Sequence, residues 1–242
     1  MNTLYWFTDD LRIADNPALI AAASDTNLTC VYCMDDAYFR TDRFGNQPIG
    51  KHRWRFLCES LRHLNDELLA LGQTVNILRG DPNAAVATLL KAGRFDRVIR
   101  AKQHTYRGPD PWDRLQTDFP DIRFDEFDVS TLFSCKDLNF EHVFPSTFSQ
   151  FKKAVGTLTY RNFLPSPDRL PTSLIELEHN QLETSGPPGK RTGGATAADL
   201  HITAYFGGKA ASTYKDTRNN LSGEDSSTGF SPWLANGSLS PL

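Results

Sequence analysis

Polar side chains suited to holding a small ligand follow several short apolar runs of the sequence. A hydroxyl and two carboxylates stand at 8–10, two carboxylates at 35–36, and an amine, an amide and an imidazole within 102–106. Parallel sheets bind ligands beyond the carboxyl ends of their strands, so loops that follow strands bring such groups together. The pattern indicates a small-ligand site. A solvated loop at 102–106 and helix-start electrostatics at 10–15 fit the same residues, and the pattern alone leaves these interpretations open.

A second polar cluster lies near the end of the chain. Ser227, Thr228 and Ser231 precede the pair Pro232-Trp233. A serine followed by a proline is typical of a helix start, so Ser231 is predicted to be an N-cap and Pro232 the first helical residue. Hydroxyls and backbone N–H groups at such a start also suit an anion. The two interpretations are compatible.

Several common motifs are absent from the sequence. It contains no G-x-G-x-x-G after the first apolar run, no P-loop and no G-x-S-x-G nucleophile elbow. The six histidines show no spacing typical of a metal site, so no metal ligand is predicted. Cys30 and Cys33 form a C-x-x-C, but they lie in an apolar run typical of a strand, where an odd spacing places side chains on opposite faces. We therefore interpret both as packing residues.

Composition and charge describe an ordinary globular protein. The chain has 242 residues, of which 39% are hydrophobic, and a formal net charge of −3 at pH 7. This charge argues against a nucleic-acid surface on this stretch, although a local basic patch can exist within an acidic total. The chain has neither a basic region leading into a long apolar run at its start nor an apolar stretch of membrane-spanning length. We therefore expect a soluble, cytoplasmic protein.

Hydrophobic periodicity predicts alternating strands and helices over the first 130 residues. Apolar residues three and four apart predict a long helix over 54–71, which Gly72 should end. Shorter helices are expected at 18–24, 82–90 and 111–118, and strands at 4–7, 28–34, 74–78, 97–101 and 122–127. Strands separated by helices indicate a parallel sheet with helices on both faces.

The composition of the sequence changes beyond this region, which suggests that the chain has three parts. Residues 1–135 form the α/β domain, 136–195 an interdomain connector, and 196–242 the start of a helical unit. The stretch 165–194 is rich in proline and glycine and is predicted to have little core of its own. Residues 200–242 hold few apolar anchors. We expect them to be poorly ordered, or to pack on the α/β domain or on a partner chain.

Several segments resemble the photolyase and cryptochrome family. Residues 6–12 (WFTDDLR) and 15–19 (DNPAL) are similar to the opening signature of that family. Residues 205–208 (YFGG), 214–219 (YKDTRN) and 227–234 (STGFSPWL) resemble its cryptochrome-DASH branch. The resemblance spans essentially the whole chain and is weakest at 165–195. It implies a flavodoxin-like or Rossmann-like antenna domain with strand order 3-2-1-4-5, joined by a linker to an all-helical FAD domain.

The resemblance also implies roles for individual residues. It assigns Tyr214, Ser227, Thr228, Phe230 and Ser231 to the phosphates and ribityl chain of FAD. It assigns Asp10, Gln103 and His104 to an antenna pocket, for which folate is the implied ligand. His104 stands where the family often has a carboxylate, and Gly229 where it has a lysine or arginine. A histidine cannot accept the paired hydrogen bond that a carboxylate accepts from a pterin.

The function implied by the resemblance is that of a blue-light flavoprotein. Relatives split cyclobutane pyrimidine dimers in DNA by light-driven electron transfer from FAD, or act as photoreceptors. The catalytic residues, the DNA groove and the rest of the FAD pocket belong to a part of relatives that follows position 242. No residue here is therefore assigned a catalytic role, and the chain is expected to be inactive alone. The alternative is a stand-alone α/β module that binds a small ligand or a protein without flavin. Self-association through exposed apolar residues of the tail is also expected.

Overall fold

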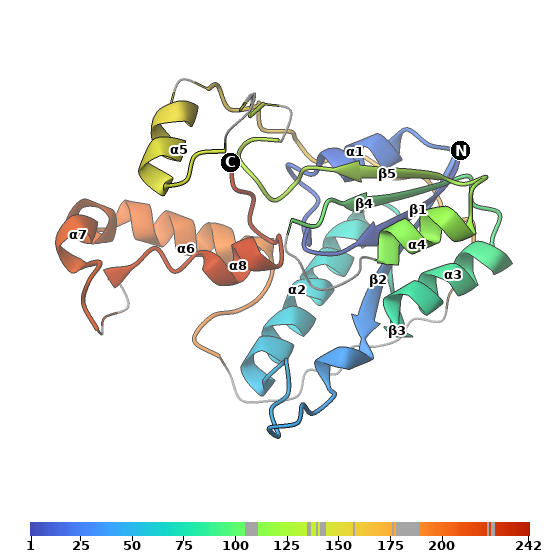
Figure 1. Cartoon of the computed structure of the whole chain (residues 1–242), viewed down its shortest axis with the longest axis horizontal. Helices are drawn as coiled ribbons and strands as arrows, with labels where there is room; N and C mark the ends of the chain where they lie inside the picture. The colour runs from blue at the N-terminus through green and yellow to red at the C-terminus, as the bar shows by residue number, and fades with distance from the viewer. Residues whose placement is uncertain are drawn as a thin grey trace.

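The structure of the protein is a computed structural model (Figure 1). It describes residues 1–104, 111–134, 137, 138, 140, 144–156, 158–175, 177, 189–221, 223 and 226–242. Part of the connector, at 178–188, and the end of the expected ligand loop, at 105 and 106, therefore lie outside the described residues.

A five-stranded parallel sheet forms the centre of the molecule. Its order is β3-β2-β1-β4-β5, and every neighbouring pair is parallel. Sheet and order confirm the expected fold class. The strands are β1 (Asn2–Phe7), β2 (Asn27–Asp35), β3 (Val75–Gly80), β4 (Arg97–Ala101) and β5 (Arg123–Phe127). The sheet reverses direction of growth between β1 and β4, so loops after these strands border the crevice in which such sheets bind ligands.

Helices cover both faces of the sheet, each over its own hydrophobic core. α1 (Pro17–Ala23) and α2 (Lys51–Ala70) pack on one face through residues such as Leu19 and Leu64. α3 (Pro82–Ala92) and α4 (Pro111–Asp118) pack on the other through residues such as Val86 and Leu115. The odd spacing of Cys30 and Cys33 places one thiol in each core, so the packing interpretation is confirmed.

Capping residues mark the boundaries of the helices. Asn16 accepts a hydrogen bond from Leu19 N at the start of α1, and Asp81 accepts one from Ala84 N at the start of α3. Both helices then have a proline in their first turn. Gly72 follows α2 with a φ of +82°, a left-handed conformation that glycine adopts without steric penalty.

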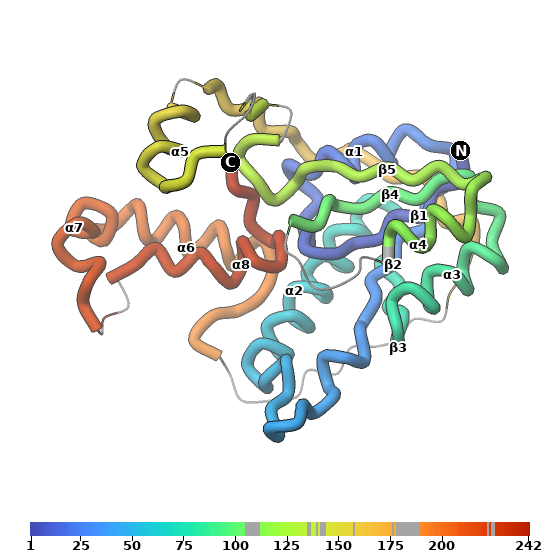
Figure 2. Tube along the Cα trace, in the orientation of Figure 1, coloured from blue at the N-terminus to red at the C-terminus, as the bar shows by residue number. Residues whose placement is uncertain are grey.

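The remaining helices lie beside the α/β domain. A short 3₁₀ helix, η1 (Asp36–Tyr38), follows β2, and α5 (Phe148–Val155) lies within the connector. α6 (Ala195–Gly207), α7 (Ala210–Thr217) and α8 (Ser231–Ala235) form the last unit. Figure 2 shows the chain returning from α8 to the loop after β1, where Leu11 N donates to the carbonyl oxygen of Asn236 at 3.1 Å. The last unit thus packs on the α/β domain, one of the outcomes expected for it.

The connector contributes more to the core than the sequence predicted. Leu170 is buried, and its N–H donates to the carbonyl oxygen of Leu71 at 3.0 Å. Gln73 Nε2 donates to the carbonyl oxygen of Pro171 at 2.6 Å. Prolines and glycines gave this stretch the composition of a linker, yet its few leucines pack along the domain. In the part of the chain that the structure describes, no helix is long and apolar enough to cross a membrane.

Candidate functional site

A cavity of about 660 Å³ opens at the carboxyl ends of β1 and β2. Its wall is formed by the loop after β1, the first turns of α2, residues 189–191 of the connector, and α8. This volume lies within the range typical of small-molecule sites. The cavity therefore exists only because the last unit and the connector lie against the α/β domain.

The lining of this larger cavity combines aromatic rings with positive charge. Tyr32, Tyr38 and Phe56 supply rings, and the wall also contains the cationic side chains Arg53, Lys190 and Arg191 and a single carboxylate, Asp9. Burial raises the pKa of Tyr32 well above its usual value, and the neighbouring Tyr38 and Asp9 raise it further. Its phenol therefore stays protonated at neutral pH. Rings and an excess of cations suit a planar aromatic ligand that carries an acidic group.

A smaller cavity of about 330 Å³ lies on the other side of Asp9. Gln103 and His104 line it together with residues of α8 and the segment after β5, so the structure brings two of the three expected antenna residues together. Gln103 Nε2 donates to Thr8 Oγ1 at 2.8 Å, and His104 Nε2 lies 2.9 Å from Asp128 Oδ1. Both side chains thus already have partners within the protein.

Asp10, the third expected antenna residue, lines neither cavity. It is fully buried, and its carboxylate accepts hydrogen bonds from Tyr5 Oη at 2.6 Å, Thr8 N at 2.8 Å and Asn16 Nδ2 at 3.2 Å. Burial raises the pKa of Asp10, and these hydrogen bonds oppose the rise. Its surroundings make Asp10 an organiser of the loop after β1.

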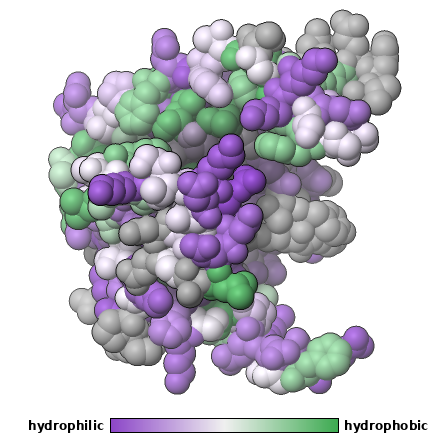
Figure 3. All heavy atoms as spheres, turned by 90° about the vertical axis from the view of Figure 1, so that its left-hand side faces the viewer, coloured by the Kyte–Doolittle hydropathy of each residue, from purple (hydrophilic) through white to green (hydrophobic). Residues whose placement is uncertain are grey.

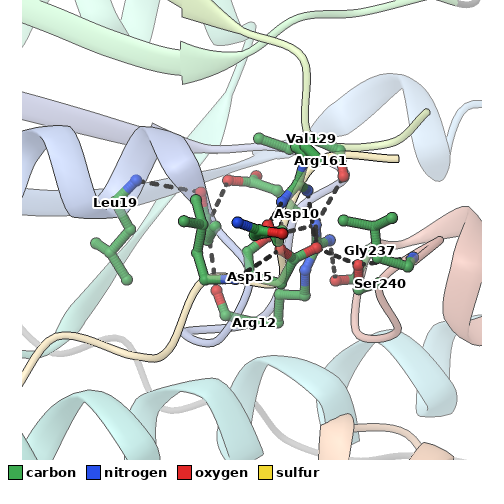
Figure 4. Close-up of polar contacts among 12 residues, drawn as sticks. Asp10, Arg12, Asp15, Leu19, Val129, Arg161, Gly237 and Ser240 are labelled. Carbon is green, nitrogen blue, oxygen red and sulfur yellow. Dashed lines mark hydrogen bonds and ion pairs between the residues drawn. The ribbon is translucent and has the colours of Figure 1, made fainter. Parts of the chain in front are cut away.

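Asp15 joins three distant segments of the chain (Figure 4). Its carboxylate accepts from both Nη atoms of Arg161, from Leu164 N and from Ser240 Oγ. Arg12 lies beside it and donates to the carbonyl oxygens of Gly237 at 3.0 Å and Val129 at 2.7 Å. We call Arg12, Asp15, Arg161 and Ser240 the Asp15 clamp. It holds the segment after α8 on the α/β domain.

The residues expected to bind FAD lie on α7, on α8 and on the segment before α8. Tyr214, Ser227 and Ser231 are exposed. Phe230 packs against His201 and Tyr205, with ring centroids 5.7 and 5.6 Å apart. His201 Nε2 lies 2.7 Å from the carbonyl oxygen of Thr228. Residues 228 and 230 thus pack on α6, and Tyr214, Ser227 and Ser231 have exposed side chains.

The predicted N-cap at Ser231 is wrong. α8 begins at Ser231 itself, and Phe230 occupies the cap position without a side-chain hydrogen bond. The backbone of Phe230 is already helical, with φ −75° and ψ −17°. Its ring contacts with α6 account for this placement, because they fix the residue next to the helix. The hydroxyl of Ser231 is consequently not used as a cap.

Sequence reasoning missed the cations of the larger cavity. Arg53 belongs to a helix that was interpreted only through its apolar stripe, and Lys190 and Arg191 lie in a stretch interpreted as a linker. The pair Lys190-Arg191 between glycines was the available signal. This pair can be interpreted as part of a site only once the connector is known to border the carboxyl ends of the strands.

Comparison with known proteins identifies a matching family model, similar sequences and similar solved structures. The family model described as DNA photolyase matches residues 3–171. A cryptochrome DASH of Idiomarina loihiensis is 37% identical over 98% of this chain and 54% of its own length. A solved cryptochrome of Synechocystis has a TM-score of 0.87 and 29% identity, covering 99% of this chain and 53% of that one. A photolyase of Sulfolobus tokodaii, solved with two FAD molecules, has a TM-score of 0.73 and 16% identity, with coverage of 99% and 53%. This chain spans about half the length of the relatives it matches.

Proposed function

Because this chain belongs to the DNA photolyase family, we propose that it forms the chromophore-positioning part of a blue-light flavoprotein. The observation that carries the proposal is the larger cavity, whose wall is shared by the α/β domain, the connector and α8. A ligand bound in this cavity at the end of the sheet would lie close to the last unit, which carries Tyr214 and residues 227–231. The sequence similarity to cryptochromes DASH over 98% of the chain supports the same function.

The flavin part of the proposal concerns the surface of the last unit. Ser227, Ser231 and Tyr214 have exposed hydroxyls that suit phosphate oxygens, and Arg191 lies next to Gly229, between the two serines in sequence. These residues therefore fit the phosphate end of FAD. Bound FAD would supply absorption of blue light and single-electron transfer. The chain's own residues hold the phosphates and fix the segment on which they rest.

The second chromophore is placed in the larger cavity. The smaller cavity, with Gln103 and His104, has about half its volume, and both side chains are paired with Thr8 and Asp128. The larger cavity offers rings for stacking and cations for an acidic group. The Sulfolobus photolyase was solved with two FAD molecules, with the implication of a novel light-harvesting cofactor. A flavin nucleotide and a reduced folate both combine a planar ring system with an acidic group.

The substrate and partners of the whole protein are also part of the proposal. Light-driven repair of pyrimidine dimers in single- or double-stranded DNA, or photoreception, is the activity that membership of the family supports. Self-association is proposed for the last unit, because α6 exposes Leu200 (68%) and Phe206 (62%). Figure 3 shows apolar side chains at the surface of this side of the molecule.

Visible absorption of the purified chain tests the cofactor assignments. The chain is incubated separately with excess FAD, FMN or a reduced folate, desalted, and its spectrum recorded. We expect a retained flavin band. A colourless protein after all three incubations would contradict the proposal and would favour the α/β module without flavin.

Two variants distinguish the cavities. Tyr38 lines only the larger cavity and Gln103 only the smaller one, although Gln103 also donates to Thr8 of the larger cavity. We expect Tyr38→Ala to reduce retention of FMN or folate at least tenfold, and Gln103→Ala to leave it unchanged. Tyr160→Ala, at an exposed tyrosine lining neither cavity, is the matched control. The reverse pattern would place the second chromophore with Gln103 and His104.

A further inference from the structure

Arg191 enters the last unit from the connector, and its guanidinium is held there by two aromatic side chains. Its Cζ lies 5.4 Å from the ring centroid of Trp233, a distance at which a cation is attracted to the ring face. Its Nη1 lies 3.2 Å from Nδ1 and 3.0 Å from Nε2 of His201. Trp233 is itself buried, with Nε1 donating to the carbonyl oxygen of Thr192 at 3.0 Å. The position of the guanidinium is therefore fixed from two sides.

His201 connects Arg191 to the segment before α8. Its Nε2 lies 2.7 Å from the carbonyl oxygen of Thr228. Nη1 of Arg191 lies within 3.2 Å of both ring nitrogens, and Nε2 donates to Thr228 in the tautomer that carries its proton there. The contact with His201 uses Nη1, so Nη2 is directed elsewhere. Arg191, His201 and residues 228–230 thus form one hydrogen-bonded surface.

Gly229 supplies the space that Nη2 of Arg191 occupies. A Cβ built on Gly229 would overlap Nη2 and would stand 2.7 Å from Cζ of Arg191. Gly229 also has a φ of +62°, which disfavours other residues. The segment can therefore carry only a glycine here while the guanidinium stays in place. A positive charge reaches this surface from the connector.

We infer that Arg191 binds the phosphate of a nucleotide-type ligand held between the hydroxyls of Ser227 and Ser231. This inference rests on the proposed function and names the cation of the proposed FAD surface. A planar guanidinium with several N–H donors matches phosphate oxygens, and the hydroxyls on either side of Gly229 supply further donors. The ligand class is a diphosphate or monophosphate ester, with FAD as the family member of that class. Arg191 also lines the larger cavity, so one side chain borders both proposed chromophore sites.

Calorimetric titration of the whole chain with inorganic pyrophosphate, and separately with FAD, tests this role. We expect Arg191→Gln to weaken the binding of each at least tenfold, the loss expected for one charge-assisted contact. Lys91→Gln removes the same charge from an exposed position on α3 and should leave both affinities unchanged. Gly229→Ala should also weaken binding, because its methyl group displaces the guanidinium. Riboflavin, which carries no phosphate, should bind equally well to wild type and to Arg191→Gln.

Each outcome separates this inference from the proposed function. If FAD binds wild type and Arg191→Gln equally well, the role of Arg191 is refuted while the flavoprotein proposal stands. If pyrophosphate binding depends on Arg191 but FAD is not retained, the anion site stands and the flavoprotein proposal falls. Absence of pyrophosphate binding to wild type overturns the inference. Because a loss in Arg191→Gln would also follow from local unfolding, Arg191→Lys provides a second variant, in which the retained charge should restore part of the affinity.

Discussion

The Asp15 clamp leads to a sharp prediction for the substitution Asp15→Asn. Asp15 is fully buried and has a φ of +50°, in the left-handed region that asparagine tolerates as well as aspartate. Asparagine also keeps the shape of the side chain. The substitution therefore removes the negative charge with little other change.

The expected loss of stability is worked from the partners of Asp15. In the folded protein the carboxylate accepts two hydrogen bonds from Arg161, whose side chain is 30% exposed, and lies 3.9 Å from Arg12 Nη2, whose side chain is 4% exposed. Hydrogen bonds to charged groups contribute about 1.5–3 kcal/mol each, and the buried Arg12 also loses one of the two carboxylates that stabilise its charge, the other being Asp10. Because water still reaches Arg161, we expect a total near the lower end, about 3 kcal/mol.

Thermal and urea unfolding followed by circular dichroism measure this loss. A loss of about 3 kcal/mol should lower the midpoint of thermal unfolding by about 6–12 °C for a chain of this size. Amide exchange of residues 236–240 should accelerate by more than that of β1, since the clamp holds this segment. The control is Asp168→Asn, at an exposed aspartate of the connector. A midpoint within 1 °C of wild type, with unchanged exchange at 236–240, would refute the role of the clamp.

Three further predictions follow from the same structure. Burial alone would raise the pKa of Asp15, but hydrogen bonds from Arg161, Ser240 and Leu164 N lower it below 3.8. The stabilisation that Asp15 provides should therefore be complete above about pH 4 and be lost as the pH falls through the folded-state pKa. Acid unfolding curves of Asp15→Asn should lack this dependence of stability on pH. Gly237→Ala should lower stability by about 1–3 kcal/mol, because a Cβ there would overlap the backbone of Asp9 and Asp10 at a φ of +72°, whereas Gly207→Ala, with open space around it, should not. Burial raises the pKa of the Cys33 thiol to about 12, so Cys33 should react with a thiol reagent only after unfolding; rapid reaction of the folded protein would contradict the packing assignment.

The α/β domain was predictable because its signals are local. Apolar runs, the N-caps Asn16 and Asp81, and Gly72 mark element boundaries within a few residues of those observed. Each of these signals acts through the backbone of its own segment. The strand order came from the resemblance to the photolyase and cryptochrome family, since periodicity does not fix which strands are neighbours.

The candidate site was less predictable because it is made by contacts between distant segments. The place of Gln103 and His104 beside a cavity was predictable, since they come just after β4. Arg191 and Arg53 were not, because their meeting depends on the path of the connector. The position of Asp10 in the sequence does not show whether its carboxylate faces a ligand or the protein interior. A carboxylate in a loop after a strand can equally serve Tyr5, Thr8 and Asn16 inside the protein.

Amide exchange of the whole chain with and without FAD tests the central claim most directly, because it locates the flavin as well as detecting it. We expect FAD to slow exchange at 189–193 and 226–236, with little change in β3 and α3, which lie away from the site. Protection of neither segment in the presence of saturating FAD, or protection confined to other parts of the chain, would contradict it.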